Sequence, residues 1–304
     1  MSSFLTPDIA PGHVLTYPDL RASGATRAGV RSALAEGSMV RARRNVYLDA
    51  SSPRAVREAQ RVGGRLDCVS AVAEAGIFVL DKSGLHVQVE PERSRLRSPH
   101  SRTTRLSGAQ GVVVHWRACD AGSLHTVPLV EALAAAVRCQ PPRAAIATLD
   151  NALFTGAIDE EGLAEVFARL PARYRVLRPL VDARAEAGSE TIARLLLRGQ
   201  GFDVRVQVQI DGVGRVDLVV DDWIVVECDS RAHHGGWEAQ ERDRLRDLRL
   251  AERGFVVLRP SARMIFSEPQ LFARAVAGLR RHLARGDEDG ECRRSRHNAG
   301  VARC

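Results

Sequence analysis

Three acidic residues interrupt two hydrophobic segments of the sequence: Asp217 in "RVDLVV", and Glu227 with Asp229 in "IVVECDS". An ionised carboxylate is costly to bury unless a cation or several hydrogen-bond donors meet it. Carboxylate oxygens are also the ligands that Mg²⁺ prefers in proteins. The pattern therefore predicts a divalent metal site with Asp217 and Glu227 as ligands, holding magnesium or, as the alternative ion, manganese.

The residues "DDW" between the two segments set the register in which the two strands would pair, and so which acids lie opposite each other. If 221–223 forms a three-residue hairpin loop, with both aspartates as turn formers, the antiparallel count places Asp217 opposite Glu227, with β-carbons about 5 Å apart. Like charges opposite one another destabilise a sheet, so a cation between them is the simplest explanation. The alternative is a structural role, such as an ion pair between Asp217 and Arg215.

Neighbouring segments predict the elements that position the acids. "GSETIARLLLRGQG" (188–201) indicates a helix capped by Ser189, with Glu190 in its first turn, where Glu190 either joins the acids or favours the helix dipole. "FDVRVQVQI" (202–210) alternates as a half-buried strand. "EAQERDRLRDLRLAERGFVVLRPS" (238–261) indicates an arginine-rich helix and then a strand. Arginines beside a metal suit phosphate groups, and phosphodiester hydrolysis uses those parts.

The order of these features resembles the PD-(D/E)XK restriction-endonuclease fold, specifically the uncharacterised proteins related to very-short-patch-repair endonucleases. The resemblance covers residues 186–285 and rests on a helix Glu, a strand Asp, a strand "E-x-D", a His four residues later, an "R-D-x-x-R" helix and a "G-x-x-V-x-R" strand. It implies metal-site acids at Glu190, Asp217 and Glu227, an acid or base at His233, and phosphate-flanking residues at Asp243 and Arg246, with Arg242 beside them.

Two positions depart from the pattern of that family. The lysine that gives the fold its name would fall where this chain has Asp229, and Ser230 follows where relatives have Gly. Two functions therefore stay open. One is a metal-dependent DNA endonuclease, with Asp229 at the catalytic position of the lysine. The other is a catalytically inactive, antitoxin-like transcriptional regulator that uses the nuclease fold for binding.

The segment from 15 to 50 indicates two short helices and a basic strand. Thr26 is the predicted N-cap of the helix "RAGVRSALAEG" (27–37), and Gly37 is predicted to end it. The buried face of this helix carries Val30, Ala33 and Leu34. This order is typical of a winged helix-turn-helix, whose second helix enters the major groove. It resembles the N-terminal domain of AbiEi-type antitoxins. The predicted DNA contacts are Arg27, Arg31, Arg41, Arg43 and Arg44. A helical adaptor that contacts protein is the alternative.

The middle of the chain carries no recognisable motif. Helices are predicted at 66–80 and 127–159, and strands at 85–91 and 111–118. Four histidines, His86, His100, His115 and His125, lack ligand spacing, so we assign them no chemistry. The six cysteines form no CxxC pair, which argues against a structural zinc site and predicts free thiols.

Composition sets the outer limits of the interpretation. No segment approaches eighteen consecutive apolar residues, and the N-terminus lacks a secretion signal, so we expect a cytoplasmic protein without membrane association. The excess of 44 Lys plus Arg over 37 Asp plus Glu favours a polyanionic partner, here DNA. The predicted fold class is α/β, in four parts: a winged helix-turn-helix (1–50), an α/β connecting domain (51–185), a restriction-endonuclease-like mixed sheet flanked by helices (186–285) and a disordered tail (286–304).

Overall fold

The computed structural model describes residues 14–119, 123–228 and 237–282, without the side chains of Glu238 and Ala239. The fold is mixed α/β and divides into two compact units, residues 1–181 and 182–304. The predicted segments 1–50 and 51–185 thus belong to one compact unit up to residue 181. The predicted site residues Asp229 and His233, and the predicted tail, lie outside the described residues.

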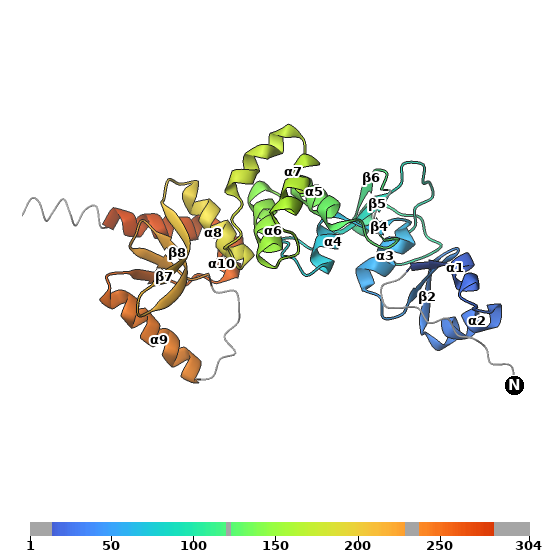
Figure 1. Cartoon of the computed structure of the whole chain (residues 1–304), viewed down its shortest axis with the longest axis horizontal. Coiled ribbons are helices and arrows are strands. Elements are labelled where there is room, and N and C mark those ends of the chain that lie inside the picture. The colour runs from blue at the N-terminus through green and yellow to red at the C-terminus, as the bar shows by residue number, and fades with distance from the viewer. Residues whose placement is uncertain (1–13, 120–122, 229–236, 283–304) are drawn as a thin grey trace, which may run out of the picture. The chain divides into compact units, whose positions relative to one another are not determined.

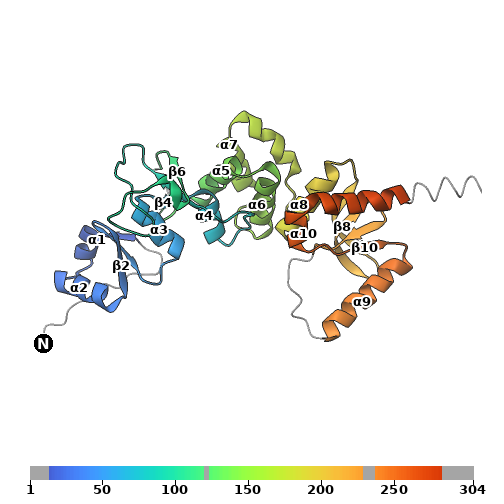
Figure 2. The same ribbon diagram turned by 180° about the vertical axis from the view of Figure 1, so that it is seen from behind.

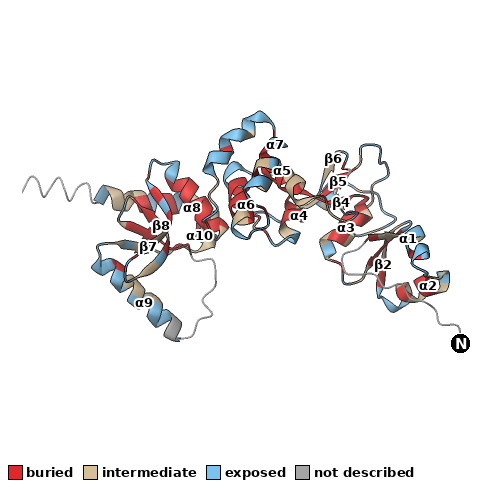
Figure 3. Cartoon of the chain, viewed as in Figure 1, coloured by how far each residue is buried: buried red, intermediate tan, exposed pale blue. Residues whose placement is uncertain are grey.

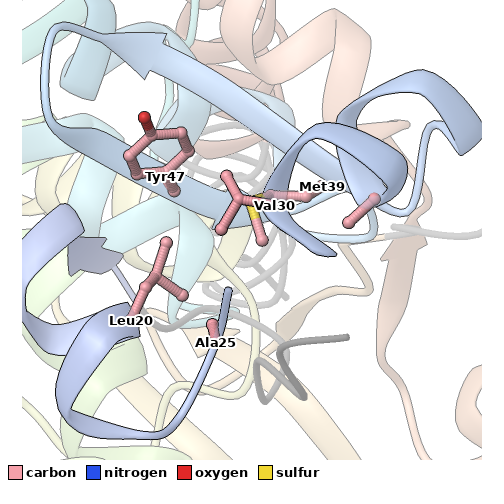
Figure 4. Packing of buried hydrophobic residues seen from close by; sticks show 6 residues of the cluster. Leu20, Ala25, Val30, Met39 and Tyr47 are labelled. Carbon is pink, nitrogen blue, oxygen red and sulfur yellow. The ribbon is translucent and has the colours of Figure 1, made fainter. Parts of the chain in front are cut away.

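The first unit begins with a small antiparallel sheet and two helices. Its elements are β1 (Val14–Thr16), α1 (Tyr17–Ala22), α2 (Arg27–Glu36), β2 (Met39–Arg43) and β3 (Val46–Asp49), and the strand order is β1-β3-β2. Leu20, Val30, Met39 and Tyr47 pack together between the helices and the sheet (Figure 4). The two predicted helices are confirmed. The predicted basic strand is a hairpin of two strands, β2 and β3, and β1 adds a third strand that the sequence did not indicate.

Local signals set the bounds of α2. The Thr26 hydroxyl accepts a hydrogen bond from the Gly29 N–H at 3.0 Å, as expected of an N-cap. Gly37 ends the helix at φ 76°, a left-handed conformation that favours glycine. Val30 and Ala33 are buried, and Arg27 and Arg31 are exposed on the other side, as the periodicity predicts.

The rest of the first unit contains a second sheet and a group of helices. Its elements are α3 (Arg54–Val62), β4 (Arg65–Leu66), α4 (Cys68–Glu74), β5 (Leu85–Val89), η1 (Gly108–Gln110), β6 (Val112–Trp116), α5 (Leu129–Cys139), α6 (Pro142–Phe154), α7 (Glu160–Ala168) and η2 (Ala172–Leu180). The strand order is β4-β5-β6, with β5 and β6 parallel. The predicted middle strands are confirmed, and the helical stretch 127–159 is two helices separated near Pro141, which cannot donate a backbone hydrogen bond.

The second unit is a four-stranded mixed sheet between helices. Its elements are α8 (Gly188–Arg198), β7 (Val204–Ile210), β8 (Gly214–Val220), β9 (Ile224–Val226), α9 (Trp237–Glu252), β10 (Val256–Leu258) and α10 (Ala262–Ser267), followed by a helical stretch at 269–282. The strand order is β10-β9-β8-β7, and β10 runs parallel to β9. Figures 1 and 2 show α9 on one side of the sheet, and α8 with the last helix on the other.

The hairpin of β8 and β9 has the register that the sequence predicts. Val220 pairs with Ile224, so 221–223 is the loop, and Leu218 pairs with Val226. Asp221 and Asp222 adopt left-handed φ values of 49° and 67°, which aspartate tolerates in tight turns. Both are turn formers, as expected, and Asp221 is also held by an ion pair with Arg280.

Hydrophobic contacts fix α9 against this hairpin. Leu250 of α9 is fully buried in a cluster with Val219 and Val225, which pair with each other across β8 and β9. The opposite side of α9 is exposed (Figure 3). The helix therefore presents one defined face to the sheet. None of the helices in the described part of the chain is long and apolar enough to cross a membrane.

Candidate functional site

Asp217 and Glu227 lie next to each other where the β8–β9 hairpin opens. Extending the pairing of Leu218 with Val226 by one residue brings these two acids opposite each other. The Asp217 Oδ2 atom accepts a hydrogen bond from the Cys228 N–H at 2.8 Å, which ties the two chain segments together beyond the strand pairing. Glu227 is 7% exposed, and its backbone N–H donates to the Leu258 carbonyl on β10 at 3.0 Å.

Glu190 reaches the same place from the N-terminus of α8. Its carboxylate accepts hydrogen bonds from the backbone N–H groups of Glu186 and Ala187, both at 3.1 Å, and from the Gln207 side chain at 2.8 Å. The prediction that Ser189 caps α8 is wrong: Ala187 holds the N-cap position, and Glu190, three residues later, accepts the Ala187 N–H with its side chain. Glu190 thus caps its own helix and also lies in the field of Asp217.

Burial raises the pKa values of all three acids, and the charge of Asp217 adds to the effect at Glu190 and Glu227. Burial, followed by the charge of Asp217, raises the pKa of Glu190 to about 7. Burial is also the main cause of the raised pKa of Asp217, and burial followed by the Asp217 charge raises the pKa of Glu227. Each acid would therefore gain from a cation at this site, because a cation favours the ionised forms.

Arg246 supplies one cation from α9. It lies one helical turn before the buried Leu250, so the same face of the helix directs it toward the sheet. Its Nη2 atom lies 2.9 Å from the Glu227 Oε1 atom, and it also donates to the Arg215 carbonyl. The Glu227 Oε1 atom is buried and has no hydrogen-bond partner among the described residues, so the contact with Arg246 is an ion pair without regular hydrogen-bond geometry.

The sequence left open a structural role for Asp217, an ion pair with Arg215. Arg215 forms its ion pair with Glu186 at the start of α8, whereas Asp217 receives the Cys228 N–H. Asp217, Glu227 and Glu190 offer the carboxylate oxygens that a hard divalent cation prefers, and Arg246 contacts Glu227. Among the described residues, the group of possible ligands that already lies within 4.8 Å of one another is a different one, in the first unit.

Other predicted residues of this unit lie along α9. Arg242 is exposed and Asp243 is half-buried. Sequence reasoning assigned no role to Arg259, the arginine of the "G-x-x-V-x-R" strand, although that motif contained the signal. Arg259 contacts Asp247 at 2.6 Å, and this hydrogen bond, followed by the charges of nearby acids that include Glu227, raises the pKa of Arg259. A second arginine thus lies close to the acids.

The five predicted arginines of the first unit differ in exposure. Arg27, Arg31 and Arg44 are exposed, whereas Arg41 and Arg43 are half-buried. The Arg41 guanidinium lies 5.9 Å from the Tyr47 ring centroid. Burial and the charge of Arg93 lower the pKa of Arg43 to about 10. The exposed three come from α2 and from the turn between β2 and β3.

One group of residues was missed entirely. Cys68, His86, His115 and Cys139 come from four elements of the first unit, and the structure brings their side chains together. Sequence reasoning assigned no chemistry to the two histidines. Because the four residues are widely separated along the chain, no spacing signal could have found them.

Comparisons with known proteins identify relatives of this chain. No family model matches it. The uncharacterised proteins MT2308 and Rv2248, from two strains of Mycobacterium tuberculosis, are each 30% identical to it over 197 residues. The match covers 60% of this chain and 71% of each relative. At this identity and coverage, the chain belongs to the family of these mycobacterial proteins.

Proposed function

We propose that this protein is a metal-dependent DNA endonuclease. The observation that carries the proposal is the convergence of Asp217, Glu227 and Glu190, three buried or half-buried acids with raised pKa values, at one end of a sheet. Groups of like charge are costly to gather unless the site uses a cation. The mixed sheet between α8 and α9 supports the resemblance to restriction-endonuclease-like proteins, on which the reaction class rests.

The residues present fit magnesium or manganese. The donors are carboxylate oxygens, which hard divalent cations prefer, and the Glu227 Oε1 atom is buried without a hydrogen bond. Asp217 and Glu227 would hold the ion, with Glu190 as the third acid. Such an ion, when bound, supplies Lewis-acid activation for phosphodiester hydrolysis.

The chain's own residues would position the DNA and balance its charge. Arg246 lies beside Glu227 and stays 28% exposed, so its guanidinium could also meet a phosphate oxygen. Because Asp229 replaces the lysine of the family pattern, that task would fall to Arg246 and Arg259, whose charges both act on Glu227. Glu190, with a pKa of about 7, would change its protonation near neutral pH and so set the charge of the site.

The first unit would supply DNA affinity. The order of β1, α1, α2, β2 and β3 supports a winged helix-turn-helix, with α2 as the recognition helix and the β2–β3 turn as the wing. Arg27, Arg31 and Arg44 are exposed on those two elements, where guanidinium groups could reach phosphates.

The second candidate is the inactive, antitoxin-like regulator. The ion pair between Arg246 and Glu227 favours it, because this arginine already neutralises one of the acids that a metal would need. The presence of Asp229 where the family pattern has lysine also favours the inactive regulator. Under this function the second unit would bind DNA or protein without cleavage.

Incubation with supercoiled plasmid separates the two candidates. We expect the parent protein to nick the plasmid in magnesium or manganese and not in metal-free buffer, and we expect Asp217→Asn and Glu227→Gln to abolish nicking. Asp221→Asn, at an acid of the same hairpin that binds Arg280, should keep it. DNA binding in a gel shift without nicking in either metal would reject the endonuclease and support the regulator.

A further inference from the structure

Two cysteines and two histidines form a compact cluster in the first unit. One ligand atom from each of Cys68, His86, His115 and Cys139 lies within 4.8 Å of all the others. The His86 Nδ1 atom is 3.1 Å from the His115 Nε2 atom, and the Cys139 Sγ atom is 4.0 Å from the same Nε2 atom. Cys68 is buried, the histidines are half-buried and Cys139 is exposed.

Secondary structure explains why these four side chains meet. His86 on β5 pairs with Val113 on β6, and Gln88 pairs with His115, so both imidazoles project from the same face of the two parallel strands. Cys68 is the first residue of α4 and Cys139 is the last residue of α5. The figures show α4 and α5 beside the β4-β5-β6 sheet (Figures 1 and 2).

The backbone around Cys68 is held in an unusual conformation. Its φ of 52° is in the left-handed region, which residues with a side chain rarely adopt. The Cys68 N–H donates to the Asp67 carboxylate at 2.7 Å, and that fully buried carboxylate forms an ion pair with Arg117 at 3.0 Å. The Asp67–Arg117 ion pair thus supports the backbone of Cys68 in this conformation.

The geometry matches a tetrahedral metal site. With Zn–S bonds of about 2.3 Å and Zn–N bonds of about 2.0 Å, neighbouring ligand atoms of a tetrahedral zinc lie about 3.3–3.8 Å apart. The His86–His115 contact of 3.1 Å and the Cys139–His115 contact of 4.0 Å lie close to that range. Sulfur and imidazole ligands select zinc over magnesium, which prefers oxygen.

The number of ligands distinguishes this cluster from a catalytic cysteine and histidine pair. It offers four protein ligands, which is the closed set of a structural zinc site, whereas catalytic zinc sites keep one position open.

We propose that Cys68, His86, His115 and Cys139 bind one structural zinc ion. The ion joins α4, β5, β6 and α5, and it is separate from the acidic cluster of the second unit. The sequence argument against zinc rested on the lack of a CxxC pair. That argument does not apply here, because four separate elements each contribute one ligand.

Metal analysis of the full-length protein, purified under reducing conditions without added metal, tests the proposal. We expect one zinc ion per chain by mass spectrometry of the elements. Cys139→Ser and His115→Gln should each reduce zinc to background. The matched controls Cys119→Ser and His100→Gln should retain it, because Cys119 contacts Arg65 and Glu131, and His100 contacts Glu58. Asp217→Asn should also retain it, which separates this site from the acidic cluster.

Cobalt substitution of the parent protein provides a measurement that needs no variant. Replacement of zinc by Co²⁺ should produce the visible absorption bands of tetrahedral, thiolate-bound cobalt. The proposal is overturned if the reduced parent protein binds neither zinc nor cobalt, or if Cys139→Ser and His115→Gln keep the zinc content of the parent. A disulfide between Cys68 and Cys139 in protein purified under reducing conditions would overturn it as well.

Discussion

Asp217→Asn is the sharpest perturbation of the acidic cluster. The substitution keeps the size of the side chain and an oxygen that can accept the Cys228 N–H, and it removes one negative charge beside Glu227 and Glu190. If the acids hold a metal, the variant should lose metal binding while the fold remains. If Asp217 only supports the hairpin, the variant should lose stability whether or not metal is present.

The magnitudes separate the two cases. Burial raises the pKa of Asp217, so ionisation of this carboxyl costs more free energy in the folded protein than in the unfolded chain. Without magnesium, removal of that charge should raise the free energy of unfolding by roughly 0.2–1 kcal/mol, the size of a cross-strand charge effect. Magnesium at one hundred times its dissociation constant should stabilise the parent by about 2.7 kcal/mol. For a unit of this size, that shifts the unfolding midpoint by on the order of 10 °C.

Differential scanning calorimetry can measure both effects on the second unit. The parent, Asp217→Asn and the control Asp221→Asn are each melted in magnesium-free buffer and in magnesium; leaving out a chelator spares any zinc in the first unit. Asp221→Asn weakens the ion pair with Arg280, so it should lose stability equally in both buffers and keep the magnesium response. The reasoning is refuted if Asp217→Asn behaves like Asp221→Asn in magnesium-free buffer and magnesium stabilises none of the three proteins.

Three further predictions concern other charged residues. The pKa of Glu190 is raised from 4.5 to about 7, so in metal-free buffer the free energy of unfolding should fall by up to about 3 kcal/mol as pH rises from 4.5 to 7. Denaturant titrations across that range should show a smaller fall for Glu190→Gln, and an equal fall would contradict this pKa assignment. Arg246→Gln leaves the buried Glu227 carboxylate without its cation, so urea unfolding without magnesium should show that the free energy of unfolding falls by about 3–5 kcal/mol. Magnesium should reduce this loss. A loss below about 1 kcal/mol would show that the ion pair is unimportant for stability. Changing Arg27, Arg31 and Arg44 together to Ala should weaken duplex binding and lower the slope of log affinity against log salt by about 3, whereas an unchanged slope in fluorescence anisotropy would remove these arginines from the DNA interface.

Patterns of neighbouring residues were sufficient to predict much of the fold and the pairing of Asp217 with Glu227. The Thr26 cap and the Gly37 stop of α2 were predicted correctly because each depends on residues within one helical turn. The pairing of Val220 with Ile224 was predicted correctly because a hairpin register follows from the length of its loop. That register brought Asp217 and Glu227 together before any tertiary contact was known.

The rest of the acidic cluster depends on tertiary packing. Arg246 meets Glu227 because Leu250, four residues further along α9, is buried against the sheet, and no local pattern specifies which face of this arginine-rich helix is covered. Ser189 appeared to be the cap of α8, yet Glu190 performs that role because its carboxylate reaches back to two backbone N–H groups. The Cys68 cluster was even less predictable from local sequence, because both the pairing of two parallel strands and the packing of two helices set its geometry.

The ion pair of Arg246 with Glu227 is the contact on which the two candidate functions diverge. The raised pKa values of the three acids mean that each ionised carboxylate is disfavoured there, and the charge of Arg246 opposes this effect at Glu227. A nuclease must let a divalent ion bind Glu227 while Arg246 moves toward a phosphate, whereas a binding protein can keep the ion pair permanently. The Arg246 side chain is 28% exposed, so part of it is accessible to such a partner, although its Nε atom is buried. The response of Arg246→Gln to magnesium therefore reports on function as well as on stability.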